Sequence, residues 1–359
     1  MSRRGIWFAA AVIISSAATI GAAFADDDAE KEVTKQTTRQ ISSAIVSRVG
    51  SIDAATPSNA INFWSTTSYN SITVRLGQTN IAGATPGTVS SIRIPDFSLN
   101  LFEELVGVDT RRGQFVFGVS EAIAYTDGSQ GGTSISTPSS SSTLGGITFT
   151  TPSSSFTQGS TQLRGVSFTT SPYAAFVLNQ YAFLTAVAGY TYGANWMKTG
   201  DMTQTTAAAP PFIPKMTTTT RGSTTTSSTD TLFADLSANG IYQIPDTQWT
   251  VSGRAGGRYY YGWTSTNVSG SSSNGAGGAA LYTAIEARYA IDAITPYVRA
   301  QYEYGIAING GKNNSTVFLG AGVDYVFTPK LVAGLDFMVQ QGDPSIQNWQ
   351  IALNIRARF

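Results

Sequence analysis

The chain has 359 residues, of which 42% are hydrophobic and only 12% are charged. Soluble domains carry about 25% charged residues, so the charge content is half the usual value. Histidine and cysteine are both absent, which excludes thiol proteases, Ser-His-Asp hydrolases and the usual zinc enzymes. Lys plus Arg and Asp plus Glu number 22 each, so no basic excess favours nucleic acid as a partner. The length suits one large all-β domain or two smaller domains.

The N-terminus has the pattern of an export signal. Its parts are Arg3 and Arg4, the apolar run Ile6 to Ile14, and the small residues Ala23 and Ala25 at the cleavage spacing. We predict a signal peptide over residues 1–25, with the mature chain beginning at Asp26. The alternative is an uncleaved membrane anchor, because the stretch stays mostly apolar for about 20 residues.

One amphipathic helix is predicted over Ala29 to Val49, because this segment contains no Gly or Pro and has a narrow apolar stripe. The stripe consists of Val33, Thr37, Ile41, Ala44, Ile45 and Val49. About 21 residues at 1.5 Å each reach roughly 32 Å, close to the thickness of the hydrocarbon core of a bilayer. We assign residues 26–56 to this helix and a linker.

From residue 57 onward, apolar residues alternate with polar or small ones, as in strands that bury one face. The last segment shows the pattern, because Trp349, Ile351 and Leu353 alternate with Gln350 and Ala352. Ten such segments occupy the last two thirds of the chain. Each has about 10 to 15 residues, whereas a tilted membrane strand needs about 9 to 11.

Two less regular segments, Ile61 to Leu76 and Thr88 to Leu101, precede these ten. Pro95 interrupts the second segment, and Asn100 to Val108 could instead form a short helix. A barrel with both ends on one side of the membrane needs an even number of strands. We therefore predict about twelve strands.

Short and long connections alternate along the predicted strands. The short ones lie at residues 179–180, 245–246, 292–294 and 328–330, and the long ones, rich in Ser, Thr and Gly, at residues 127–162, 199–230 and 264–278. The composition of the long ones predicts flexible loops. Short turns on one side and long loops on the other indicate a transmembrane antiparallel β-barrel over residues 57–359. The alternative, a soluble β-sandwich, needs a densely polar outer face that these strands lack.

The polar faces of the strands are predicted to line the lumen of this barrel. The charged residues on them are Asp235, Arg254, Arg258, Glu286, Arg288, Arg299, Glu303, Asp324, Asp336, Arg356 and Arg358. Mixed signs on neighbouring strands, such as Glu286 and Arg299, can pair across the strands. We interpret them as an ion-pair lining that holds the wall and a plug, because a selectivity filter needs one sign at a constriction. The predicted helix could be that plug, or it could lie in the periplasm.

Four stretches carry a family resemblance. They are TTSPYAAFVLNQYAFLTAVAGYTYGANW (Thr169 to Trp196), TPYVRAQYEYGI (Thr295 to Ile306), FLGAGVDYVFTPKLVAGLDF (Phe318 to Phe337) and the final IALNIRARF. With the polar helix before the first strand, they resemble the translocator β-domain of autotransporters, the type V secretion proteins of Gram-negative bacteria. The resemblance implies an outer-membrane location and a helix that threads the lumen.

The resemblance also implies partners. In that family the barrel assembly machinery reads the C-terminal strand, a role that would fall here on Phe359, Ala357, Ile355, Leu353 and Ile351. Outer-membrane lipid and periplasmic chaperones are the other implied partners. One departure is large: autotransporters carry a passenger of hundreds of residues before the barrel, whereas about 35 residues separate Asp26 from Ile61 here.

Two functions remain from this reasoning. The first is a pore or translocator-like barrel with a polar lumen, narrowed by the helix. The second is a surface interaction or adhesion protein that uses the long loops. We expect no enzyme, cofactor or metal, because outer-membrane proteases and phospholipases use histidine, although a carboxylate-only site with Asp235 or Glu303 is the alternative.

Overall fold

The computed structural model describes residues 33–49, 61–75, 78–82, 89–93, 95–137, 140–144, 147–151, 153–208, 215–266, 274–308, 313–342 and 346–358. The predicted cleavage residues Ala23 and Ala25 and the terminal Phe359 lie outside these residues, as does the side chain of Arg358. In the described part of the chain, the single helix, residues 33–49, is too short and too polar to cross a membrane.

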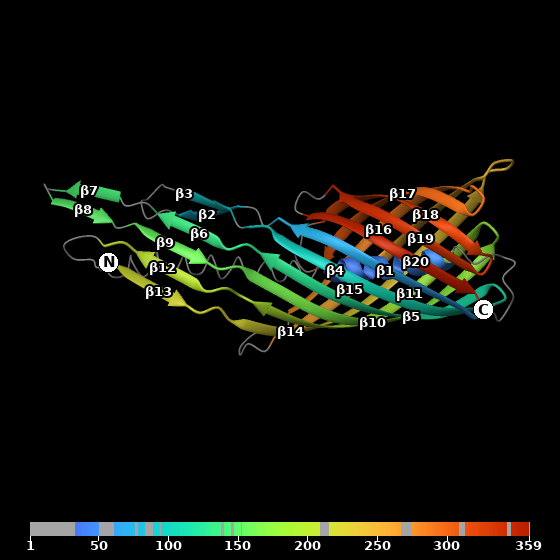
Figure 1. Ribbon diagram of the computed structural model, residues 1–359, viewed down its shortest axis with the longest axis horizontal. Coiled ribbons are helices and arrows are strands. Elements are labelled where there is room, and N and C mark those ends of the chain that lie inside the picture. Colours follow the sequence, from blue (N-terminus) through green and yellow to red (C-terminus); the bar gives the residue numbers. More distant parts are fainter. Residues whose placement is uncertain are drawn as a thin grey trace.

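Twelve long antiparallel strands form a closed barrel (Figure 1). They are β1 (Ile61–Val74), β4 (Phe97–Arg112), β5 (Phe115–Gln130), β10 (Thr161–Asn179), β11 (Ala182–Lys198), β14 (Thr224–Gln243), β15 (Trp249–Thr266), β16 (Asn274–Tyr289), β17 (Ile294–Ile308), β18 (Asn314–Thr328), β19 (Leu331–Gln341) and β20 (Ile346–Arg358). The ring closes where β1 pairs with β20, from Asn62 opposite Arg358 to Val74 opposite Ile346. The predicted twelve-stranded barrel is confirmed.

One end of the barrel carries only tight turns. The predicted short connections all lie there, together with a turn between β4 and β5. Gly113, Asp246 and Asp292 have positive φ angles of 62°, 57° and 51° in these turns, the left-handed conformation that Gly, Asn and Asp adopt most readily. Because β1 begins and β20 ends at the same end, all long connections lie at the opposite end.

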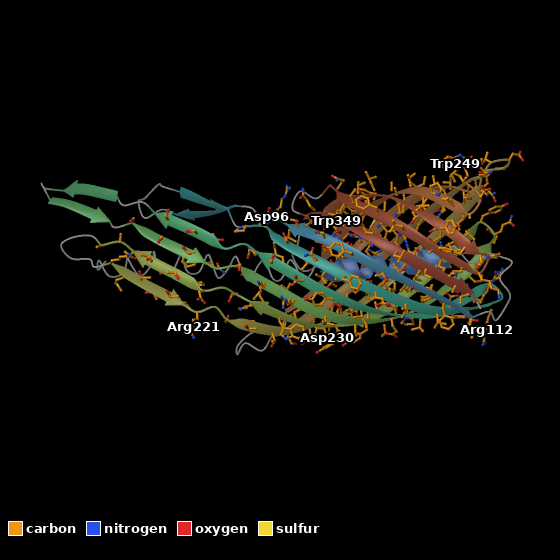
Figure 2. The ribbon with its side chains drawn as sticks, in the orientation of Figure 1. Asp96, Arg112, Arg221, Asp230, Trp249 and Trp349 are labelled. Carbon is orange, nitrogen blue, oxygen red and sulfur yellow. The ribbon has the colours of Figure 1, made fainter. Side chains whose placement is uncertain are left out.

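The outer wall of the barrel is apolar. Large side chains there are strongly exposed, among them Leu236 at 64% and Val298 at 59%. Trp249 lies toward the short-turn end of this apolar band and Trp349 toward the other end (Figure 2). A soluble protein does not expose apolar surface on this scale. A closed barrel with such a band is suited to hydrocarbon, in which every strand is paired and no sheet edge is exposed.

Two carboxylates interrupt the apolar band. Glu104 on β4 and Glu121 on β5 face outward, between Phe102 and Val106 and between Val119 and Ile123, respectively. Glu121 Oε1 accepts a hydrogen bond from Thr170 Oγ1 at 2.7 Å. The outer face of β4, β5 and β10 therefore carries polar groups within the apolar band.

The second strand was predicted in the wrong place. The structure places β4 at Phe97–Arg112 instead of residues 88–101, and residues 100–108 are strand, not helix. Residues 89–93 form β3 (Val89–Arg93), which pairs with β2 (Gln78–Ala82) in a separate hairpin. The adjacent Glu103 and Glu104 interrupt the alternation of apolar and polar residues by which a strand is predicted. Glu103 faces the lumen and Glu104 faces outward.

Much of the predicted loop segments 127–162 and 199–230 is strand in the structure. β5, β10, β11 and β14 continue beyond the barrel into a four-stranded sheet, here called the outer sheet (Figure 1). It consists of β6 (Thr133–Thr137), β9 (Ser154–Gln158), β12 (Met202–Thr206) and β13 (Met216–Thr220), and a further hairpin joins β7 (Ser140–Leu144) to β8 (Ile147–Thr151). Ser- and Thr-rich segments cannot build a core, but backbone pairing alone extends an existing sheet.

Glycines inside the barrel make room for aromatic rings on the neighbouring strand. A Cβ atom on Gly107 of β4 would overlap the indole of Trp64, its pairing partner on β1.

We expect Gly107→Ala to lower the free energy of unfolding by about 1–3 kcal/mol, the usual cost of overpacking. Urea unfolding of the refolded barrel, followed by tryptophan fluorescence, measures this loss.

Gly253→Ala is the matched control. The Cβ of this substitution would lie 4.0 Å from its nearest neighbour, the Ala284 carbonyl oxygen, in ordinary van der Waals contact. Equal losses of stability in the two variants would show that backbone entropy, and not the packing of Trp64, sets the effect.

Candidate functional site: the helix inside the barrel

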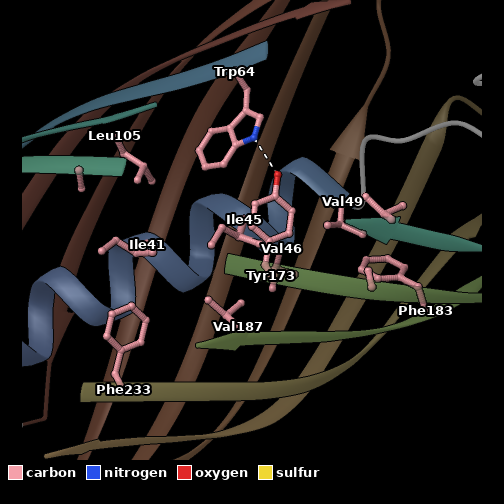
Figure 3. Packing of buried hydrophobic residues seen from close by; sticks show 13 residues of the cluster. Ile41, Ile45, Val46, Val49, Trp64, Leu105, Tyr173, Phe183, Val187 and Phe233 are labelled. Carbon is pink, nitrogen blue, oxygen red and sulfur yellow. Dashed lines mark hydrogen bonds between the residues drawn. The ribbon is translucent and has the colours of Figure 1, made fainter. Parts of the chain in front are cut away.

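The helix of residues 33–49, here called the lumen helix, lies inside the barrel (Figures 1 and 3). Val33 packs against a cluster with Ile72 and Leu99 near the long-connection end. Arg48 contacts Asp109, which lies near the short-turn end. The helix therefore runs from the long-connection end toward the short turns, and the alternative of a periplasmic helix does not describe this structure.

One wall of the lumen is apolar and holds the stripe of the lumen helix (Figure 3). Ile41, Ile45, Val46 and Val49 pack there against a cluster from six consecutive strands of the ring. The side chains of that cluster are Trp64, Leu105, Val116, Ala122, Tyr173, Ala175, Phe183, Val187 and Phe233. The predicted lumen was polar throughout, so this wall corrects the prediction.

Alternation alone could not reveal the apolar wall. On β5 the outward Phe117 and Val119 flank Gly118, while Val116, Ala122 and Ala124 face inward and are buried. Both faces of the strand are therefore apolar, and the pattern gives no sign of which face meets the lumen. One feature of the sequence could have indicated the inward face of these strands, namely glycines that lie opposite aromatic residues of the neighbouring strand. Gly118, which lies beneath the ring of Tyr173, is an example.

The C-terminal end of the lumen helix is held by a buried carboxylate. Arg48 binds Asp109 through two bonds, Nε to Oδ2 at 2.8 Å and Nη2 to Oδ1 at 3.0 Å. Asn62 Nδ2 donates to Asp109 Oδ1 at 2.9 Å, and the Tyr173 hydroxyl donates to Oδ2 at 3.1 Å. Trp64 Nε1 donates in turn to that hydroxyl at 3.0 Å. Because four donors satisfy the carboxylate, its burial at this depth is stabilised.

A second bidentate pair holds the middle of the lumen helix. Arg39 donates to Glu303 through Nη2 at 3.0 Å and Nε at 3.2 Å, and its Nη1 donates to Gln36 Oε1 at 2.6 Å. Its guanidinium carbon lies 4.0 Å from the centre of the Phe318 ring. The side chains of Arg39 and Glu303 are only 2% and 1% exposed. The helix is thus fixed to β17 on the wall opposite its apolar stripe.

This pair continues into a chain of charges across the lumen. Arg258 on β15 lies 3.5 Å from Glu303 Oε2 and binds Asp235 on β14 at 3.1 Å. The Tyr282 hydroxyl donates to Asp235 Oδ1 at 2.6 Å. All four charged side chains of the chain Arg39, Glu303, Arg258 and Asp235 are nearly inaccessible. They form a closed section of the lumen beside the helix.

The structure places the ten predicted lumen residues whose side chains it describes on the inner face. Asp235, Arg258, Glu303, Asp324 and Asp336 are buried, and Arg254, Glu286, Arg288, Arg299 and Arg356 are half-buried. Glu286 and Arg299 are opposite each other in register but do not form the predicted pair. Arg288 binds Glu286 and Asp324, Arg356 binds Asp324 at 2.8 Å, and Arg299 binds Asp336.

Of the two carboxylates that hold the lumen helix, Glu303 was predicted to face the lumen, but Asp109 was not. Asp109 and Glu103 lie on β4, where the predicted strand ended at residue 101, so their inward direction could not be derived. Arg39 and Arg48 are nine positions apart, two and a half turns of a helix, and so project in opposite directions. That spacing was the available signal that one helix could contact two walls.

A cavity of about 300 Å³ remains beside the lumen helix, lined mainly by β15 to β20 and also by residues of β1, β4, β11 and β14. Its walls carry Arg254, Arg288, Arg299 and Arg356, and the helix contributes Gln40 and Ser43. Among the described residues no group of three or more Asp or Glu side chains could hold a metal ion. The inner surface therefore divides into an apolar wall, a closed charge network and a cavity of mixed lining, to which Leu105 and Phe183 of the apolar wall also contribute.

The sequence matches no family model and no curated protein. The fold, however, is similar to the translocator domain of the autotransporter NalP from Neisseria meningitidis, with a TM-score of 0.60, 10% identity, and coverage of 92% of this chain and 98% of that one. It is also similar to the β domain of the Bordetella autotransporter BrkA, with a TM-score of 0.50, 13% identity, and coverage of 83% and 99%. The chain thus has the fold of an autotransporter translocator barrel, as its sequence resemblance implied.

Removing Arg48 tests how the lumen helix is held. We expect Arg48→Met to lower the free energy of unfolding by about 3–5 kcal/mol, because the buried Asp109 loses its arginine. Adding Asp109→Asn should recover part of the loss, since the neutral amide is cheaper to bury. Urea unfolding in detergent micelles measures both variants.

The control is Arg164→Met, which breaks an exposed pair with Asp127 whose side chains are 65% and 51% exposed. Such a pair contributes about 0–1 kcal/mol. If Arg48→Met proved no more destabilising than this control, the helix would not depend on the Asp109 cluster.

Proposed function

We propose that the chain is an outer-membrane barrel of the autotransporter-translocator type, whose lumen is closed by its own N-terminal helix. The observation that carries this proposal is the double attachment of the lumen helix. Its apolar stripe packs on one wall, and Arg39 and Arg48 form buried bidentate pairs with Glu303 and Asp109. A helix held in this way fills a pore more firmly than a loosely inserted segment.

The outer wall supports a Gram-negative outer membrane as the location. The translocators with a similar fold come from Neisseria and Bordetella, and barrels of this type place their short turns in the periplasm and their long connections outside. In that orientation the lumen helix enters from the cell surface and ends near the periplasm. Val33, at the N-terminal end of the helix, would then lie on the side of the cell surface, as expected of a translocator barrel.

The last strand has the features expected of an assembly signal. Ile351, Leu353 and Ile355 are 40–47% exposed on the outer face of β20, at the seam where the barrel closes. An apolar, lipid-facing closing strand suits recognition by the barrel assembly machinery. Periplasmic chaperones would protect the same face before insertion.

The outer sheet favours a second candidate function, interaction at the cell surface. Two rows of hydroxyl side chains cross its four strands. The first row is Ser134, Thr157, Thr203 and Thr219, and the second is Ser136, Ser155, Thr205 and Thr217. Hydroxyls within the rows contact one another, as at Thr205 and Thr217, whose oxygens are 3.3 Å apart. An uncharged, regular surface that extends beyond the barrel is suited to contact with an external partner.

Conductance tests the plug. We expect deletion of residues 26–55 to raise the single-channel conductance of the refolded barrel in planar bilayers several-fold, because the helix occupies the lumen. The double variant Arg39→Ala, Arg48→Ala should open intermittently. Ser47→Ala, at an exposed position of the helix, is the control and should behave as the unaltered protein. Unchanged conductance after the deletion would contradict the plug.

The absence of cysteine allows a direct test of orientation. Thr217→Cys in the outer sheet should react with a membrane-impermeant maleimide on intact Gram-negative cells. Gln248→Cys, in the short turn between β14 and β15, should react only after the outer membrane is permeabilised. The reverse pattern of labelling would show that the barrel has the opposite orientation.

A further inference from the structure

The lumen cavity lies on the polar side of the lumen helix, in the half nearer the short turns. Its lining includes Thr250, Arg288 and Arg356, each within two residues of the short-turn end of its strand. Toward the long-connection end, the pair of Arg39 and Glu303 bounds it. The cavity therefore extends from the middle of the barrel, where the charge network bounds it, to the short-turn end.

Positive charge dominates the lining. Five arginines line it, Arg39, Arg254, Arg288, Arg299 and Arg356, against three acidic residues, Glu103, Glu286 and Asp336. Four of the five arginines form ion pairs, some with carboxylates that lie behind the lining, such as Asp324 and Glu303. The negative charges are thus partly set back from the surface that a solute would meet.

Arg254 differs from the other four. Its Nη2 donates to Ser43 Oγ of the lumen helix at 3.2 Å and to Gln301 Oε1 of β17 at 3.0 Å. Its guanidinium lies 5.0 Å from the centre of the Tyr282 ring. Within the described residues none of its bonded partners is a carboxylate, and Asp235 acts on this cation only through longer-range electrostatic attraction.

Two further donors in the lining have no hydrogen-bond partner among the described residues. Gln40 is 8% exposed, its Oε1 accepts from Ser68 Oγ at 3.1 Å, and its Nε2 is unsatisfied. Arg299 Nε is unsatisfied as well. Gln40 lies one turn before Ser43, and Arg299 lies two residues before Gln301 on the same face of β17. Gln40 therefore lies between Ser68 on β1 and the contact of Ser43 with Arg254, whereas Arg299 lies on the same wall as Gln301.

The lining also contains unsatisfied acceptors. Asp336 Oδ1 lies in the carboxylate that binds Arg299, and Glu103 Oε2 lies on β4, across the lumen from Arg254. A polar cavity of this size holds water, which can satisfy such acceptors. An anion, in contrast, is favoured beside Arg254, the lining arginine to which no carboxylate of the described residues is bonded.

We propose that the lumen cavity binds a small oxyanion, with Arg254 as its principal charge and Arg299 Nε and Gln40 Nε2 as additional donors. The planar fork of a guanidinium matches the oxygen geometry of carboxylate and phosphate. The volume suits a small solute. This inference rests on the lumen helix remaining in place, as in the proposed function, because Gln40 and Ser43 belong to that helix.

Binding to the refolded full-length protein tests the site. Sodium phosphate and sodium succinate are titrated separately by calorimetry, at an ionic strength held constant with sodium chloride. We expect saturable binding of at least one of the two, and the stronger one identifies phosphate or carboxylate as the preferred chemistry. Arg254→Gln should weaken that binding at least tenfold, whereas Arg164→Gln, outside the lumen, should leave it unchanged. Absence of saturable binding by either anion, or equal affinity in Arg254→Gln, would overturn the proposal.

A second variant keeps the test decisive if Arg254→Gln does not refold. Gln40→Leu removes only an unpaired amide donor and should weaken anion binding several-fold; unchanged affinity would overturn the role of this donor and with it the site. The binding measurement is independent of conductance. If the full-length barrel binds the anion but conductance is equal with and without residues 26–55, the anion site is supported and the plug is contradicted. If the deletion raises conductance but the full-length barrel binds neither anion, the plug is supported and the anion site is contradicted.

Discussion

A barrel of twelve strands is too wide for its own side chains to fill. About eight strands give an interior that side chains close by themselves, so a twelve-stranded wall leaves space that needs either water or another segment of chain. The lumen helix supplies that segment. The apolar inner wall, the buried arginine pairs and the residual cavity are all consequences of placing one helix, with one apolar stripe, in a space wider than itself.

The helix divides the lumen by chemistry. On the side of its stripe, Ile41 and Ile45 are completely buried against aromatic and aliphatic side chains. On the other side, the wall cannot reach the helix with short side chains, and arginines and glutamates extend across the gap, as between Arg39 and Glu303. The pairs of Arg39 with Glu303 and of Arg48 with Asp109 are stable at this depth because each is bidentate. The same requirement explains why charge is scarce on the outer wall and concentrated inside.

The sequence predicted the barrel well because lipid on one side and a polar lumen on the other impose strict alternation. β15 to β20 follow that rule, and their inward charges were identified residue by residue. Prediction failed where the rule does not hold. On β4, Glu103 and Glu104 face opposite sides; on β5, both faces are apolar; and in the outer sheet, backbone pairing needs no apolar pattern. The partners of individual charges, such as Arg48 and Asp109, depend on three-dimensional placement that no one-dimensional spacing contains.

The seam between β1 and β20 carries a topological consequence. The lumen helix precedes β1 in the chain, yet it lies within the ring that the pairing of β1 and β20 closes. It packs on β1, β4, β5, β10, β11 and β14, all from the N-terminal part of the ring, and these strands can curve around it as an open sheet. Once the seam has formed, no lateral gap remains for the helix to enter or leave, and only axial sliding is possible. Closure of the seam therefore confines the lumen helix to movement along the barrel axis.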